Sequence, residues 1–236
     1  MNRHLMARRS FHLSSVRRCG VFIMLLAAPL LLVSSAYADL ISIGFQEAGV
    51  NSGMITTKAT GSGNVTVSGL TYGTFSVNDV SAQDATILGP PGLLNSNLLD
   101  ISTATPGVLT VWITAQGLSF TGVQNFISSF AVNSLRGSIV QVTENTYFSS
   151  TNARYGGTLL DSALFNAIGT KGPDSTLGAT SGTYSVTEQY VIFDIGGVVG
   201  NDNLTIDLSA QPIPEPASLG LLGSGLLGMI ALKFRR

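Results

Sequence analysis

The middle of the chain is marked by short runs in which every second residue is apolar. In an extended strand this alternation places apolar side chains on one face and polar side chains on the other. The runs with this pattern cover residues 41–45, 65–67, 75–77, 109–113, 139–143, 184–187 and 204–208, and residues 190–193 are continuously apolar. Clusters of Gly and Asn separate the runs as turns. About nine such strands predict an all-β fold, an antiparallel β-sandwich with jelly-roll-like connections.

Two segments depart from the alternating pattern. In the first, the apolar residues follow helical spacing and are Val123, Phe126, Ile127 and Phe130. Apolar positions at i, i+3, i+4 and i+7 form one face of a helix, so we expect a short helix there. The second segment, residues 156–168, has its apolar residues in adjacent pairs. It predicts another short helix or an irregular cover over the sheet.

The first 38 residues have the three parts of a secretory signal peptide. Five Arg and no acidic residue precede an apolar run over residues 21–33, which is roughly 20 Å long as a helix. Because that is short of about 30 Å of hydrocarbon, the run suits a cleaved signal helix better than an uncleaved anchor. Ala36 and Ala38 form an A-x-A pattern, and we expect signal peptidase to cut after Ala38.

The last 25 residues, 212–236, combine a proline-rich spacer, an apolar stretch and a basic end. The spacer contains the motif Pro214-Glu215-Pro216, and its prolines exclude both a helix and a central strand. The apolar stretch, about residues 217–233, predicts a transmembrane helix. Basic residues hold such a helix end on the cytoplasmic side of the membrane. Here they are Lys233, Arg235 and Arg236.

These three pieces in this order resemble the PEP-CTERM sorting signal, which is also classified as an ice-binding protein C-terminal domain. The resemblance implies an exported protein that is held briefly in the inner membrane. It further implies recognition of Pro214-Glu215-Pro216 by an exosortase and release to the cell surface or the exopolysaccharide matrix. The body shows no periodic rank of Thr side chains, so the ice-binding label attaches to the tail alone.

The body, residues 39–211, is similar to a group of uncharacterised exported PEP-CTERM proteins. The segments that carry this similarity are residues 109–114, 117–122 and 184–188. No activity is implied by it, so it supports the fold and the destination alone.

Charge and composition restrict the chemistry of the body. Residues 39–211 hold 4 basic and 12 acidic residues, a net charge of -8, whereas the whole chain has a net charge of -1. Both His residues and the single Cys lie in the signal peptide. The body therefore has no disulfide, Ser-His-Asp triad or zinc site of ordinary composition. An acidic body also argues against nucleic acid as a partner. We expect no cofactor and no metal.

Two kinds of site built from oxygen ligands are still compatible with this composition: a catalytic carboxylate pair and a calcium site. Glycoside hydrolysis needs two carboxylates that face one cleft, and twelve acids are available. Most stand singly beside turn residues, which favours solvated turn Asp and a protein that is not an enzyme. Residues 201–203 together with Asp207 could offer oxygens to calcium, although turn capping is the better interpretation because the EF-hand pattern is absent.

Trp112 is the candidate glycan contact. It stands between Val111 and Ile113, so it faces outward if those two residues face the core. The aromatic residues that could join it are Tyr147, Tyr155 and Tyr190. The alternative is a core position between the sheet and a covering loop. The sequence thus predicts a structural or adhesive role in an exopolysaccharide matrix. The alternatives are a carbohydrate-binding module and a secreted carbohydrate-active enzyme.

Overall fold

The computed structural model describes residues 40–135, 138–197 and 201–213. Ten strands and two very short helices make up this part of the chain. The strands are β1 (Leu40–Glu47), β2 (Thr56–Gly61), β3 (Asn64–Tyr72), β4 (Phe75–Asp84), β5 (Gly92–Thr103), β6 (Gly107–Ser134), β7 (Ile139–Ser149), β8 (Thr158–Phe165), β9 (Gly169–Asp194) and β10 (Asn203–Pro212). The helices are η2 (Asn51–Gly53) and α2 (Ala85–Leu88).

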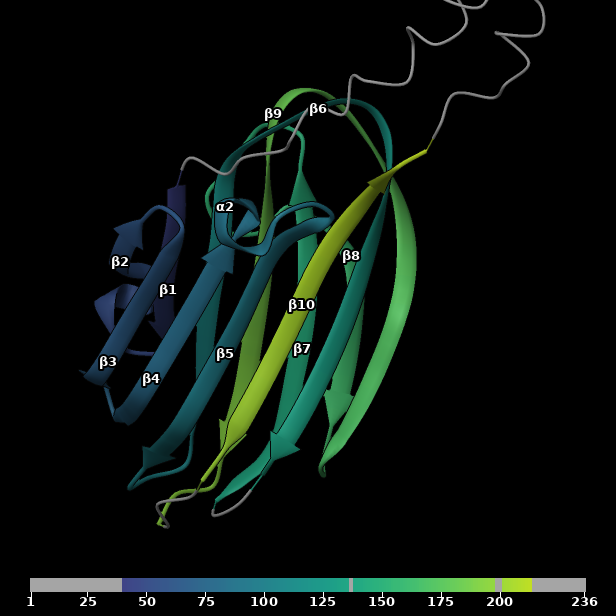
Figure 1. The fold of residues 1–236 in the computed structure, drawn as a ribbon. Coiled ribbons are helices and arrows are strands. Elements are labelled where there is room, and N and C mark those ends of the chain that lie inside the picture. Colours follow the sequence, from purple (N-terminus) through teal and green to yellow (C-terminus); the bar gives the residue numbers. More distant parts are fainter. Residues whose placement is uncertain (1–39, 136–137, 198–200, 214–236) are drawn as a thin grey trace, which may run out of the picture. The chain divides into compact units, whose positions relative to one another are not determined.

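The strands form two packed layers that share the long strands β6 and β9 (Figure 1). The first half of β6 pairs with β1 and with residues 186–194 of β9, and these strands form the first sheet, in the order β2-β1-β6-β9-β7-β8. The second half of β6 pairs with β10 and with residues 169–178 of β9. These strands form the second sheet, in the order β3-β4-β5-β10-β6-β9. All of these pairings are antiparallel.

The passage from one sheet to the other lies at a break in the β6–β9 register. The pairing shifts between Ala115 and Leu118, around Gly117. Gly117 has a positive φ of 79°, which a residue with a side chain adopts only at a cost. A bulge of this kind bends a strand sharply and increases its twist. Strands β6 and β9 can therefore leave the first sheet and continue in the second.

The inward side chains of both sheets form one hydrophobic core. The first sheet contributes Ile43 and Val111, and the second contributes Leu98 and Ile206, all fully buried. Burying a large apolar side chain stabilises a fold by about 1.5–3 kcal/mol. The predicted all-β class and the antiparallel strands are confirmed, and the two layers are those of a β-sandwich. The jelly-roll-like connection order stays a prediction.

The predicted helix at 123–130 is wrong, because these residues belong to β6. In a strand, residues separated by four positions also share one face, so Phe126 and Phe130 both point into the core. Val123 lies on the other face and is 45% exposed. Strands β9 and β10 pair with this segment on either side, and its Val, Ile and Phe residues suit that environment.

The expectation for residues 156–168 is also wrong, because residues 158–165 form β8 at the edge of the first sheet. Ala163 and Phe165 face the core, while Leu159 and Leu164 remain exposed. The apolar residues of β8 thus lie on both of its faces, which hid its alternation. Across the described ranges, no helix is both long and apolar enough to cross a membrane. The predicted signal peptide and transmembrane helix fall outside those ranges.

Candidate functional site

Trp112 lies on the outward face of the first sheet, as its alternation with Val111 and Ile113 predicted. Its two neighbours are fully buried, whereas Trp112 is partly exposed. Its indole Nε1 donates a hydrogen bond of 3.0 Å to Oε1 of Gln46 on β1. The indole ring has Tyr147 and Tyr155 as neighbours, with centroids 6.1 and 6.4 Å away. Three aromatic rings from different parts of the chain therefore meet on one surface.

Trp112 is the centre of a straight row of residues that runs across the strands. Gly44 of β1 is its register partner on one side, and Gln189 of β9 is its partner on the other. The same row continues to Asn145 of β7. At its ends are Thr57 of β2 and Ser162 of β8. We call these six residues the cross-strand row; it contains aromatic, amide and hydroxyl groups but no charge.

A loop between β7 and β8, residues 150–157, holds Tyr155 beside Trp112. Its backbone accepts hydrogen bonds from the sheet, among them Ser185 Oγ to the Ala153 carbonyl at 2.6 Å. The Tyr155 amide donates to Thr114 Oγ1 at 3.2 Å, and its hydroxyl pairs with Thr57 Oγ1 at 2.9 Å. The ring is therefore fixed before any ligand arrives, which lowers the entropic cost of binding. This loop covers part of the sheet but leaves Trp112 partly exposed.

Gly44 makes room for the Tyr155 ring. A Cβ atom on Gly44 would lie 2.7 Å from both Cζ and Oη of Tyr155, closer than real contacts allow. A Gly inside a strand often marks such a close approach. The alternation of residues 41–45 predicted the strand but not the function of its glycine. A glycine inside a strand was visible in the sequence at position 44. Its partner, the Tyr155 ring, lies 111 residues further along the chain and could not be inferred from it.

The amide groups of the row are oriented by hydrogen bonds to one another. Oε1 of Gln189 accepts from Nδ2 of Asn145 and from the Tyr147 hydroxyl, both at 2.8 Å. Neither bond uses the Gln189 Nε2 group. Burial raises the pKa values of Tyr147 and Tyr155, so both phenols stay protonated at neutral pH. The sequence analysis missed Gln46, Asn145 and Gln189, because they are ordinary polar residues until the register aligns them.

Tyr190 does not join the surface and was wrongly grouped with it. It lies inside the core, where its hydroxyl accepts a hydrogen bond from the Ile206 amide at 3.0 Å and pairs with Ser96 Oγ at 2.9 Å. Its residue number has the same parity as those of Glu188 and Ile192, and all three face inward. A continuously apolar run such as residues 190–193 predicts a strand that is buried on both faces, but this is wrong here, because Phe193 is 42% exposed.

Two carboxyl groups are buried between the sheets. Glu144 and Glu188 are fully buried and occupy diagonal positions, because Glu144 pairs with Tyr190 and Glu188 pairs with Thr146. One oxygen of Glu188 accepts from the Ser96 hydroxyl. Neither oxygen of Glu144 has a hydrogen-bond partner in the described part of the chain. This pair faces the core, so a dissolved polysaccharide cannot reach it.

Burial controls the ionisation of both carboxyl groups. It raises the pKa of Glu144 to about 8, and the nearby Ala131 backbone amide offsets this only in part. Burial also raises the pKa of Glu188, against the Ser96 hydrogen bond, and the charges of Asp207 and Glu144 raise it further. Removing an ion from water is costly, so burial favours the protonated form of both groups, and with a pKa of about 8 the protonated form of Glu144 dominates at neutral pH.

The residues considered for calcium do not gather. Asp202 is buried just before β10, whereas Asp207 lies on the outward face of that strand. Five residues of extended chain separate the two by about 16 Å, too far to share one ion. Among the described residues, no group of three or more His, Cys, Asp or Glu residues could hold a metal.

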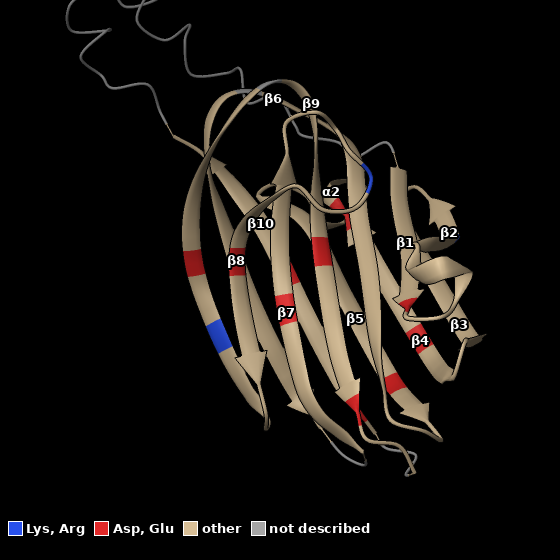
Figure 2. Ribbon diagram, turned by 180° about the vertical axis from the view of Figure 1, so that it is seen from behind, with Lys and Arg blue, Asp and Glu red and all other residues tan. Residues whose placement is uncertain are grey.

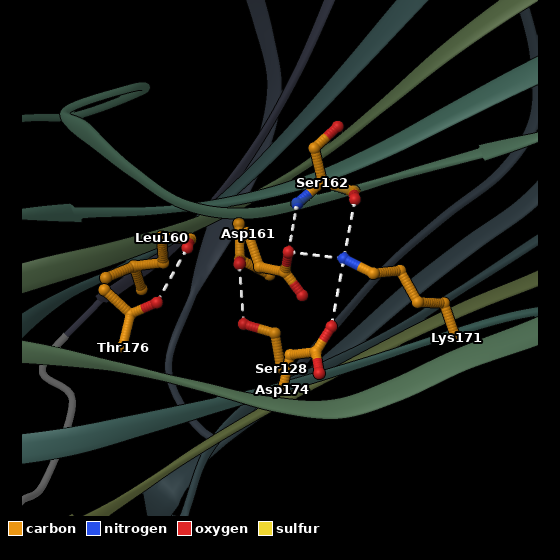
Figure 3. A network of polar contacts seen from close by, with 8 residues as sticks. Ser128, Leu160, Asp161, Ser162, Lys171, Asp174 and Thr176 are labelled. Carbon is orange, nitrogen blue, oxygen red and sulfur yellow. Dashed lines mark hydrogen bonds and ion pairs between the residues drawn. The ribbon is translucent and has the colours of Figure 1, made fainter.

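Lys171 bridges the two sheets at the β8–β9 edge (Figure 3). Its Nζ lies 2.5 Å from Oδ1 of Asp161 on β8 and 3.1 Å from Oδ2 of Asp174 on β9. It also donates to the Ser162 carbonyl at 2.9 Å. The contact is structural, because it ties β8 in the first sheet to the part of β9 in the second sheet.

The outward face of the second sheet is polar and contains no aromatic ladder. Asn97 and Asn133 each donate to both Asn203 Oδ1 and Thr205 Oγ1 at 3.1–3.2 Å. Two hollows of about 210 and 200 Å³ lie over this sheet. Their linings include Asn95 in the first and Asp207 in the second.

Comparisons with known proteins identify a sorting motif in the tail but assign no family to the body. Residues 212–236 match the family model of the PEP-CTERM protein-sorting motif. No curated protein matches the chain. Among solved structures, TmCBM61 in complex with β-1,4-galactotriose is 11% identical, with a TM-score of 0.26 and coverage of 57% of this chain and 82% of that chain.

A second similar structure is the C-terminal CBM6 of LamC, a marine laminarinase from Zobellia galactanivorans. It is 16% identical, with a TM-score of 0.23 and coverage of 62% of this chain and 98% of that chain. These scores are too low to support an inference about the β-sandwich. The match at the tail agrees with the residues that the sequence analysis singled out. The chain carries a PEP-CTERM sorting motif at residues 212–236, which implies exosortase processing, export and transient anchoring of the chain by its tail.

Proposed function

We propose that this chain is an exported adhesive protein of an exopolysaccharide matrix that binds polysaccharide without cleaving it. The binding surface is the outward face of the first sheet around Trp112. The sorting motif supports this destination, because it implies export, transient anchoring by the tail and exosortase processing. The β-sandwich provides the adhesive contact once signal peptidase and an exosortase have removed the two ends.

The observation that carries this proposal is the cross-strand row with the two tyrosine rings, Tyr147 and Tyr155, beside its Trp112. Sugar rings present apolar C–H faces and polar hydroxyl edges, so they are recognised by aromatic faces with hydrogen-bonding groups beside them. Trp112 and Tyr147 offer ring surface, and the nearly buried Gln189 and Asn145 lie beneath it and hold the Tyr147 hydroxyl in place. The groups are held by contacts within the protein, so little order is lost on binding.

The non-enzymatic part of the proposal is supported by the places of the carboxylates. A retaining or inverting glycosidase uses two carboxyl groups that flank the scissile bond. In the first sheet, the mid-strand pair Glu144 and Glu188 lies inside the core, while the outward positions around Trp112 carry no Asp or Glu. A secreted carbohydrate-active enzyme, the rival function, would need such a pair on that face.

Binding is tested with the full-length chain in a non-glycosidic detergent and polysaccharide purified from the matrix of the producing cells. Trp112→Ala is expected to weaken binding at least about tenfold, the effect of removing a central aromatic contact. Asn97→Ala, on the second sheet, is the matched control and should bind like the wild type. Equal binding by the wild type and Trp112→Ala would refute the proposed surface. Release of reducing ends would favour the enzyme instead.

Processing is tested by mass spectrometry of the mature protein after cell fractionation. We expect a chain outside the cell that begins at Asp39 and ends near Pro216. An intact Arg236 in the membrane fraction would contradict exosortase processing. Replacement of Glu215 by Ala within the sorting motif should retain the protein in the membrane.

A further inference from the structure

We infer that the ligand of this face is a single neutral polysaccharide chain that lies across the strands, along the cross-strand row. The inference rests on the proposed function and goes beyond it in three respects: the direction of the bound chain, its lack of charge and its solubility. Each follows from a different property of the described residues.

The direction follows from the register. The row joins residues on six neighbouring strands, from Thr57 through Trp112 to Ser162. Adjacent strands lie about 4.8 Å apart, so the row is roughly 24 Å long. The groups that a ligand can reach along it are Thr57, the Tyr155 ring that covers Gly44, the Trp112 and Tyr147 rings, and Ser162. Asn145 and Gln189 are only 8% and 7% exposed and lie beneath this surface. Several consecutive sugar rings fit that length, whereas one sugar would contact only the aromatic centre. Binding should therefore strengthen as the oligosaccharide grows.

The lack of charge follows from the positions of the charged residues along the strands, which are coloured on the ribbon in Figure 2. Every residue of the row and of its two neighbouring rows on the central strands β1, β6, β9 and β7 is uncharged. The neighbouring rows contain Gln46, Thr110, Val191 and Thr143 on one side, and Ser42, Thr114, Thr187 and Tyr147 on the other. Stacking and hydrogen bonds remain as the attractive forces on this face.

The rest of the body disfavours a polyanion. Its net charge of -8 repels a chain of carboxylates or sulfates. Two described cations lie next to the face. Arg154 is in the loop that carries Tyr155, and its Nε donates to Gln116 Oε1 at 3.4 Å. Lys171 donates to the Ser162 carbonyl but is already paired with Asp161 and Asp174. Lys58 of β2 is directed away from the row, over the Tyr72 ring at 5.2 Å. One flanking arginine and one lysine paired with two carboxylates cannot neutralise a charged polysaccharide along six strands.

The solubility of the ligand follows from sheet twist. Adjacent strands rotate by roughly 20–25°, so the side-chain direction turns progressively along the row. A free chain can turn with it, but the flat surface of a crystalline polysaccharide or of ice cannot contact all six positions together. The face therefore suits hydrated single chains, which are what an exopolysaccharide matrix contains.

The test measures binding of the full-length chain in a non-glycosidic detergent to four probes. They are soluble galactomannan, soluble mixed-linkage β-glucan, polygalacturonate and microcrystalline cellulose. We expect at least one neutral soluble chain to bind, with a dissociation constant that changes less than about twofold between 50 and 500 mM salt. Hydrolysed oligosaccharides of that chain should bind more tightly with each added sugar, up to the length of the row.

Variants separate the inference from the proposed function. Ser162→Ala, at the exposed β8 end of the row, should weaken long-chain binding roughly three- to tenfold, the value of one or two hydrogen bonds, and leave the shortest bound oligosaccharide unaffected. Arg154→Ala should change nothing. Tighter binding of polygalacturonate or of crystalline cellulose, abolished by Trp112→Ala, would overturn the inference and leave the proposed surface standing. Binding of a neutral chain that Trp112→Ala does not weaken would refute both.

Discussion

The two sheets of this protein place their mid-strand carboxylates on opposite sides. In the first sheet the mid-strand acids Glu144 and Glu188 point into the core, and the outward face around Trp112 is uncharged. In the second sheet the mid-strand acids Asp79 and Asp207 lie outside the core, whereas Asp84, at the end of β4, is buried. Ser68 donates to Asp79 at 2.8 Å, a contact at the solvent surface.

The buried carboxyl groups lower the stability of the first sheet, and the surface carboxylates of the second sheet have no comparable cost. A buried carboxyl group without hydrogen bonds is unfavourable, and a surface one costs little. The same sheet carries the aromatic rings and the oriented amides. Functional surfaces are often found where a fold departs from its own stability rules. The comparison therefore supports the first sheet as the working face and makes the second an internal control.

The largest expected effect is a loss of stability at alkaline pH, caused by Glu144. Its pKa is about 8 in the folded protein, against 4.5 as a free side chain. Because the folded state holds the proton more tightly, the free energy of unfolding should fall as pH rises from about 4.5 to 8. At about 1.4 kcal/mol per pH unit, this one group removes on the order of 5 kcal/mol over that range. Below about pH 4.5 Glu144 is protonated in both the folded and the unfolded state, so this loss of stability is absent.

Urea unfolding at several pH values between 5 and 9 measures this slope. Glu144→Gln keeps the shape but cannot ionise, so it should flatten the slope and be more stable than the wild type at pH 9. Glu188 titrates in the same direction and leaves a residual slope, which Glu144→Gln combined with Glu188→Gln should remove. If both variants keep the wild-type dependence of unfolding free energy on pH, the buried acids do not lower the stability of the first sheet, and the contrast between the two sheets fails.

The fold was largely predictable from the sequence because half-buried strands leave a period of two. Strand β5 was not predicted because its apolar residues come in pairs, Leu93-Leu94 and Leu98-Leu99, which obscure the period of two. The false helix at 123–130 arose because a spacing of four residues fits both a helix and a strand. Sequence periodicity contains no information on pairing partners, so the shared strands β6 and β9 could not be foreseen.

The next effect concerns Gly44, whose missing side chain admits Tyr155. Gly44→Ala should displace the Tyr155 ring and destabilise the protein by about 1–3 kcal/mol, the usual cost of overpacking. It should also weaken polysaccharide binding, because Tyr155 would no longer lie beside Trp112. Gly69→Ala is not a neutral control, since its φ is +60°, so Gly182→Ala, with open space around it, serves instead.

Isothermal calorimetry and thermal unfolding of both glycine variants separate the two consequences. The expected pattern is lost binding in Gly44→Ala alone. If Gly44→Ala binds normally despite its lower stability, the Tyr155 ring is not part of the recognition surface.

A smaller effect is expected at the edge where Lys171 joins the sheets. Lys171→Met removes its contacts with Asp161 and Asp174, and should cost about 1 kcal/mol because the lysine is 37% exposed and screened by water. High salt should reduce the difference between variant and wild type. Urea unfolding in 50 mM and 1 M NaCl measures it, and polysaccharide binding should be unchanged. A loss of binding would mean that Lys171 positions Ser162, the β8 end of the cross-strand row, for recognition.

How much of the site could be predicted depended on the kind of residue. Trp112 was found because a large aromatic side chain at an outward strand position is unusual in a soluble sheet. Tyr147 and Tyr155 were named beside Tyr190 without any means of separating them. The separation came from the register, which places Tyr147 outward on β7 and Tyr190 inward on β9. Gln189 and Asn145 carry no individual signal, since their role exists only in the row.

The smallest expected effect comes from the second sheet and completes the comparison. Asn97→Ala removes two hydrogen bonds, from Asn97 Nδ2 to Asn203 Oδ1 and to Thr205 Oγ1. Asn133 donates to the same two oxygens, so neither acceptor is left without a partner. The free energy of unfolding should therefore fall by only about 0.5 kcal/mol, and binding should not change. If Asn97→Ala weakens binding as much as Trp112→Ala does, both faces recognise the polysaccharide, and the contrast between the two sheets does not determine function.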